Sequence, residues 1–168
     1  PVDIVATITS KSEGTDGFFV QNGEFGIYVD YGGRQSSHLH VKQQIRIVGL
    51  TRSGGFAPIV AQVDITPLGE VSWPKPAIVD IELAPTGVYD CTWAELTGRI
   101  RRLRYEFNND LTFDAMTELG LITVKVARIS DRPAIAALVD GKVRIRGVLA
   151  SVFTTKQELR GYQMLVHS

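Results

Sequence analysis

The stretch Gly17-Phe-Phe-Val-Gln-Asn-Gly-Glu-Phe-Gly-Ile-Tyr-Val-Asp30 decides the fold. Its centre, Asn22-Gly23, supplies the positive φ angles that a tight hairpin turn requires. Apolar and polar residues alternate on both sides of that turn, which is typical of half-buried strands. The predicted core residues are Phe18, Val20, Ile27 and Val29, and the predicted outer-face residues are Phe19, Gln21 and Tyr28.

Three more strands complete this first module. Residues 2–9 alternate before the hairpin, and residues 45–50 and 59–65 follow it. Gly49 interrupts the fourth strand and predicts a bulge or a sharp bend, as small barrels need. The polar segment between residues 31 and 44 predicts a loop or a short helix. The module therefore has five strands, with an irregular connection between the third and the fourth.

Prolines and glycine mark the end of the first module. They cluster between residues 67 and 85, and proline disfavours central strands and long helices. The apolar pattern of residues 2–8 then returns at 94–100, and residues 139–148 repeat residues 41–50 almost position for position. We predict a first OB-like barrel at 1–70, a Pro-rich linker at 71–90 and a second OB-like barrel at 91–168. The fold class is all-β, with two tandem five-stranded OB-like Greek-key barrels.

The second hairpin can be aligned with the first in two registers. Matching Gly120 to Gly26 puts Asp114 in the core, whereas alternation puts Leu111 and Phe113 there. A slip of one residue turns every side chain to the other face. We favour the register that alternation gives.

Composition limits the classes of function. The formal net charge is zero, which argues against strong non-specific nucleic-acid binding. Residues 91–168 nevertheless carry twelve Lys and Arg against eight acids, so the second half is basic. Cys91 has no partner for an internal disulfide and is predicted to be a small buried hydrophobe. No apolar run is long enough to span a membrane, and the abrupt start at Pro1 suggests an excised part of a longer protein.

The order of several motifs resembles a known family. The motifs are Pro-Val-x-Ile-x-x-x-Ile-Thr at 1–9, Phe-Val-Gln-Asn…Gly-Ile-Tyr-Val-Asp at 19–30, Val-Gly-Leu-Thr…Gly-Gly-Phe-Ala-Pro-Ile-Val at 48–60, Tyr-Asp-Cys-x-Trp-Ala-Glu-Leu-Thr-Gly at 89–98 and Val-Arg-Ile-Arg-Gly-Val at 143–148. Together they resemble the tandem OB-fold sensor region of bacterial sensor histidine kinases in two-component systems. The family usually has Gly where this chain has Ala6.

That resemblance implies a role and a location. The region would be the periplasmic, extracytoplasmic input part of an inner-membrane protein, followed by a transmembrane helix and cytoplasmic signalling modules. It would have no catalysis of its own and would need no cofactor. The resemblance supplies no site residues.

Residues that could carry chemistry are few. His38 and His40 could present two imidazoles to a metal, but zinc normally takes three or four protein ligands, so a solvated loop is the favoured interpretation. One Cys and three His give no nucleophile–base arrangement, and no pair of acids lies in a catalytic context. We therefore expect a protein that is not an enzyme and holds no metal.

Two sets of residues suit binding. Arg99, Arg101, Arg102 and Arg104 with Tyr105 form a basic run that fits single-stranded nucleic acid or a sugar phosphate. The other interpretation is a solvated strand face paired with local acids such as Glu95 and Glu106. Phe19 and Tyr28 could stack on a base or sugar ring, or pack against the second module. The candidate ligand- or partner-binding residues are Phe19, Gln21, Tyr28, Phe56, Arg101, Arg104 and Tyr105.

Two hypotheses follow. The first is a non-catalytic extracytoplasmic sensory or interaction module of a bacterial signalling receptor, which binds an unidentified small molecule or a protein and could form a homodimer. The alternative is a tandem OB-fold protein that binds single-stranded nucleic acid, which the basic second half favours.

Overall fold

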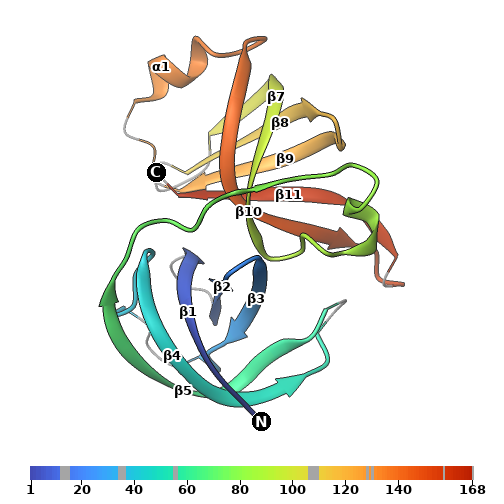
Figure 1. Ribbon diagram of the computed structural model, residues 1–168. Helices are drawn as coiled ribbons and strands as arrows, with labels where there is room; N and C mark the ends of the chain where they lie inside the picture. The colour runs from blue at the N-terminus through green and yellow to red at the C-terminus, as the bar shows by residue number, and fades with distance from the viewer. Residues whose placement is uncertain are drawn as a thin grey trace.

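The computed structural model describes residues 1–11, 16–33, 37–54, 57–105, 110–127, 129, 131–156 and 158–167. Two β-barrels lie one above the other, with the linker crossing between them (Figure 1). The candidate residue Phe56 lies outside the described residues.

The first barrel is closed in the order β1-β2-β3-β5-β4, with β1 pairing back to β4. Its core contains the predicted Phe18, Val20 and Val29, and Ile27 packs against them half-buried. Its strands are β1 (Val2–Lys11), β2 (Gly17–Asn22), β3 (Phe25–Asp30), β4 (Gln43–Arg52) and β5 (Ile59–Glu70).

The second barrel repeats that strand order, as β7-β8-β9-β11-β10 with β10 paired to β7. A short helix precedes its fourth strand, the place where the sequence predicted an irregular connection. The all-β prediction of two five-stranded OB-like barrels is therefore confirmed. The elements are β7 (Thr92–Tyr105), β8 (Leu111–Thr117), β9 (Gly120–Ala127), α1 (Arg132–Ala136), β10 (Lys142–Phe153) and β11 (Leu159–His167).

The linker contributes structure of its own. A two-residue strand, β6 (Ala77–Ile78), pairs in parallel with the start of β7. A 3-10 turn at Ala84–Thr86 follows before the chain enters β7. Part of the linker is thus built into the second sheet.

The second hairpin has the register that alternation predicts. Phe18 pairs with Val29 in the first barrel, and Phe113 pairs with Val124 in the second. Leu111 and Phe113 are buried, whereas Asp114 lies on the outer face. The match of Gly120 to Gly26 is wrong, because the structural equivalent of Gly26 is Leu121.

The fifth strand is longer than the sequence predicts. It continues past Ile65 and through Pro67 to Glu70, where we expected proline to end it. Pro67 has no backbone N–H to donate. It is tolerated because β5 pairs with β3 only near Val60, so at Pro67 one edge of the strand has no neighbouring strand that needs that N–H. The bulge predicted at Gly49 is confirmed by a register shift between its two neighbours on β4.

Gly147 occupies the position in β10 that Gly49 occupies in β4. A Cβ on Gly147 would lie 2.5 Å from the carbonyl oxygen of Leu165 on β11. We predict that Gly147→Ala lowers the free energy of unfolding by about 2 kcal/mol, because the two strands must move apart. Urea denaturation measures this value.

Gly23→Ala is the control for that experiment. Its φ of 59° favours glycine, but a Cβ there meets no atom within 4 Å. The variant should cost only about 1 kcal/mol, from backbone strain alone. Equal losses in the two variants would contradict the proposed close contact at Gly147.

Candidate ligand site at the junction of the barrels

Gln21 joins the two barrels through its side-chain amide. It points outward from β2, yet it is only 4 % exposed because the second barrel covers it. Its Oε1 accepts a hydrogen bond from the backbone N–H of Trp93 at 2.6 Å, and its Nε2 donates to the carbonyl of Gly23 at 2.8 Å. Both ends of one buried amide are thereby satisfied, one of them across the junction.

Gly26 lets the two backbones meet. A Cβ on this residue would lie 1.9 Å from the carbonyl oxygen of Cys91, so only glycine fits. Cys91 has a φ of 62° and is buried, as the sequence predicted. Burial first, and then the neighbouring Asp90 carboxylate, raise the pKa of the Cys91 thiol far above its ordinary value. This cysteine is therefore a packing residue of the junction.

Two tryptophans fix the linker to the second barrel. Trp73 and Trp93 stack with ring centroids 4.3 Å apart and planes inclined by 3°. They are the two tryptophans of the chain. Trp73 thus holds the first residues of the linker against the start of β7, beside the bond from Trp93 to Gln21.

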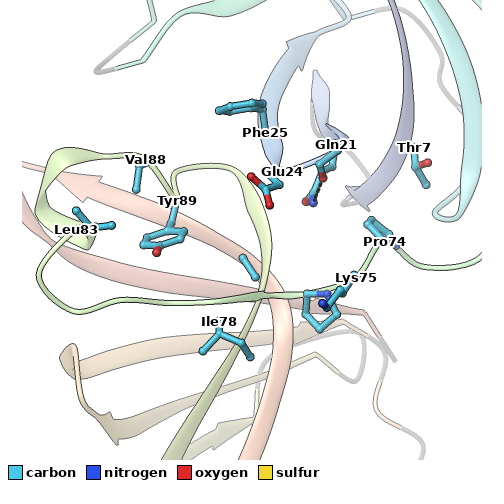
Figure 2. A pocket seen from close by; sticks show the side chains of 13 residues that line it. Thr7, Gln21, Glu24, Phe25, Pro74, Lys75, Ile78, Leu83, Val88 and Tyr89 are labelled. Atoms are coloured by element: carbon cyan, nitrogen blue, oxygen red, sulfur yellow. Dashed lines mark hydrogen bonds between the residues drawn. The ribbon is translucent and has the colours of Figure 1, made fainter.

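A hollow of about 800 Å³ lies between the β2–β3 turn, the linker and the turn that precedes β7. Figure 2 shows Glu24 and Phe25 on the first barrel's side, with Lys75, Ile78 and Tyr89 on the other. Phe25 and Ile78 are among the most exposed large apolar side chains of the described residues. One acid and one base beside exposed apolar groups suit a small amphipathic ligand.

Phe19 and Tyr28 also face the second barrel. Their rings pack edge to face, with centroids 5.2 Å apart. They line a smaller hollow of about 240 Å³ together with Phe153 and Gln163 of the second barrel. Burial first, and then the carboxylates of Asp30 and Asp16, raise the pKa of the Tyr28 hydroxyl. Of the two roles weighed for this aromatic pair, the arrangement favours packing between barrels.

The basic run is largely engaged by nearby acceptors. Arg104 makes two hydrogen bonds to Asp114, at 2.7 and 2.8 Å. Arg101 pairs with Asp140 at 3.1 Å, and Arg99 donates to the Asp140 backbone carbonyl. Tyr105 is 41 % exposed at the end of β7. The acids that pair with the run are Asp114 on β8 and Asp140 in the turn before β10. Of the acids that the sequence suggested, Glu95 pairs with Arg144 and Arg146 on β10, and Glu106 lies outside the described residues.

The predicted binding residues therefore form two separate groups. Phe19, Gln21 and Tyr28 lie at the junction, and Arg101, Arg104 and Tyr105 lie on β7 of the second barrel. Sequence reasoning missed the residues of the larger hollow, above all Glu24 and Lys75. Gly26, the second residue of β3, was an available signal for the junction beside that hollow, because glycine inside a strand often marks the close approach of another backbone.

The histidine loop is polar, as expected. His40 Nε2 lies 3.1 Å from a carboxylate oxygen of Glu70. Leu39, which stands between His38 and His40 in the sequence, is buried, whereas both histidines are exposed. Across the described ranges, no group of three or more His, Cys, Asp or Glu side chains is placed to hold a metal ion. No helix found in those ranges is long and apolar enough to cross a membrane.

Comparisons with known proteins place the chain beside structures of low similarity. No protein-family model and no curated protein matches it. A murine DNA binding protein bound with double-stranded DNA is 11 % identical, with a TM-score of 0.41 over 98 % of this chain and 94 % of that one. The Ifi202 HINa domain in complex with double-stranded DNA is 9 % identical, with a TM-score of 0.42 over 99 % and 91 %. TM-scores this low carry no inference about function, and the fold assignment rests on the strand pairing described above.

The contact made by Gln21 can be tested by truncation. We predict that Gln21→Ala lowers the free energy of unfolding by about 2 kcal/mol, because the Trp93 N–H is left buried without an acceptor. The tryptophan emission should shift to longer wavelength as water reaches Trp93. Met116, the equivalent position on β8, is 46 % exposed, so Met116→Ala is the matched control and should change neither quantity. Equal effects in both variants would exclude a special role for Gln21.

The pair of Arg104 and Asp114 should make the second barrel sensitive to acid. Hydrogen bonds from Arg104, which outweigh the desolvation of the carboxyl group, hold the pKa of Asp114 below its ordinary value. A lowered carboxyl pKa stabilises the fold above the unfolded-state value of about 4, and that contribution is lost as the pH falls further. We predict that Asp114→Asn flattens the dependence of unfolding free energy on pH below about 4. Asp64→Asn, on the exposed side of β5, serves as the control and should leave the slope unchanged.

Proposed function

We propose that the chain is a non-catalytic binding module whose ligand occupies the hollow between its two barrels. The observation that carries this proposal is the position of the hollow, which is lined by the first barrel, the linker and the turn before β7. A ligand there touches β1, the β2–β3 turn and the linker that joins the barrels. Its binding energy therefore acts directly on their packing.

The side chains suggest the chemistry of the ligand. Glu24 and Lys75 offer opposite charges, and Phe25, Ile78 and Tyr89 offer apolar surface. The Tyr89 hydroxyl accepts a hydrogen bond from the backbone N–H of Asp80, which fixes the ring at the wall. We infer a small amphipathic molecule with a charged group and an apolar body.

We further propose that this binding is sensory and that the module lies outside the cytoplasm as the input region of a bacterial signalling receptor. The support is the resemblance to sensor histidine kinases along the whole chain. Trp73 and Lys75 are separated by one residue, so a ligand beside Lys75 bears on the stacked tryptophans and on β7. That path would carry a change of barrel packing toward the rest of the receptor.

Ligand screening tests the proposed site. A thermal-shift panel of amino acids, nucleosides and sugar acids should yield a class that raises the melting temperature and alters tryptophan emission. The double variant Glu24→Gln/Lys75→Gln should abolish both responses. Glu158→Gln/Lys156→Gln makes the same charge changes before β11 and should keep them. A ligand that binds the first double variant with unchanged affinity would exclude the hollow as its site.

The sensory role has a separate test. The coding sequence next to this region should encode a membrane-spanning segment and a signalling module. If it encodes neither, the receptor assignment fails even where ligand binding at the hollow succeeds.

A further inference from the structure

The outer face of β7 and β10 carries more positive charge than its neighbours balance. Side chains at alternate positions of the two strands point away from the barrel and are exposed. Where β7 lies beside β10 and the turn that precedes it, the described residues of this face include five cations and two carboxylates, whereas the exposed Arg102 and the Asp114-paired Arg104 lie farther along β7, beside β8. The cations are Arg99, Arg101, Lys142, Arg144 and Arg146, and the carboxylates are Glu95 and Asp140.

The two carboxylates are shared, so they cannot neutralise the face. Glu95 bonds to Arg146 at 2.6 Å and also to Arg144 at 3.4 Å. Asp140 pairs with Arg101 through its carboxylate but meets Arg99 only through its backbone carbonyl. The arginine side chains in these pairs remain 51 to 67 % exposed. An excess of about three positive charges therefore faces solvent.

The first barrel shows that the fold does not require this charge. Val2 pairs with Gly49 in the first barrel, as Ala94 pairs with Gly147 in the second, and this match defines the equivalent positions of the two barrels. One ion pair, between Asp3 and Arg46, corresponds to the pair of Glu95 and Arg144. The other four cations have uncharged equivalents in the first barrel, which are Thr7 for Arg99, Thr9 for Arg101, Gln44 for Lys142 and Val48 for Arg146. Four positive charges are thus specific to the second barrel and exceed what closing the barrel needs.

We propose that this basic ladder on β7 and β10 binds the phosphate backbone of a nucleic acid without reading its sequence. Alternate side chains on a strand lie about 6.6 Å apart, and one strand of DNA carries a phosphate about every 3.4 Å along its axis. Both rows of charge are regularly spaced, so successive cations of the ladder can each meet a phosphate of a strand that lies along them. Arginine, which supplies four of its five cations, bonds phosphate oxygens in pairs through its planar guanidinium.

The shape of the ladder distinguishes nucleic acid from a lipid surface. The cations follow two adjacent strands for roughly 20 Å, so they form a line on a convex barrel. A linear polyanion fits such a line, whereas a flat bilayer would touch only part of it. This ladder is separate from the hollow at the junction, and its function does not depend on the proposed small ligand.

Fluorescence anisotropy with labelled oligonucleotides of mixed sequence, single- and double-stranded, tests the proposal. Binding at about 50 mM salt should weaken roughly tenfold or more at about 200 mM, and changing the base sequence should leave the affinity unaltered. The variant Arg99→Gln/Lys142→Gln leaves both carboxylates with their ion-pair partners. It should bind at least about 10-fold more weakly at the lower salt and reduce the salt slope by about one for each side chain removed.

Arg52→Gln/Arg160→Gln is the charge-matched control, because both arginines are exposed and lie on β4 and β11. It should bind as the unaltered chain does. The single variant Lys142→Gln tests the same ladder while it keeps the hydrogen bond from Arg99 to the Asp140 carbonyl. Circular dichroism checks that each variant is folded. Equal affinity of the two double variants overturns the proposal. So does binding to vesicles of anionic phospholipid with no binding to either oligonucleotide at the lower salt.

Discussion

The hydrogen bond from the Trp93 backbone to the side chain of Gln21 sets the relation between the two halves of the molecule. A buried N–H without an acceptor is costly, so the second barrel settles where the Gln21 amide can reach it. Gly26 permits that approach by leaving room for the Cys91 carbonyl. The hollow lies beside these contacts, where the β2–β3 turn of the first barrel faces the linker.

Comparison of the barrels with each other locates their specialised surfaces. The two share a strand order, a glycine in the fourth strand and a bulge at the same place in the first strand. They differ on their outer faces. Where the first barrel has Gln21 and Gly26 against its neighbour, the second has exposed Met116 and Leu121. The two copies therefore share their core pattern and differ in what their outer faces contact.

Local patterns in the sequence predict most of the fold and little of the site. Alternation correctly places Phe113 inside and Asp114 outside, because successive side chains of a strand point to opposite faces. The sequence does not predict that β5 continues through Pro67. Whether a strand tolerates proline depends on which of its edges has no neighbouring strand, and this follows from the tertiary structure. The junction and the arginine pairs join residues far apart in the chain, as Arg101 and Asp140 do. No local period encodes such contacts, so the arginine pairs become visible only once the strands are paired and the junction only once the barrels are docked.

The short strand β6 makes part of the linker a structural element of the second barrel. It pairs with Ala94 and Glu95, on the side of β7 that β8 reaches only from Gly98 onward. The linker thus fills an opening in the second barrel's wall, and Trp73 covers Trp93 nearby. A second barrel cut free at residue 91 would expose an unpaired strand edge and a bare indole, both prone to aggregation. A second barrel expressed on its own should therefore begin at the start of the linker, before Trp73.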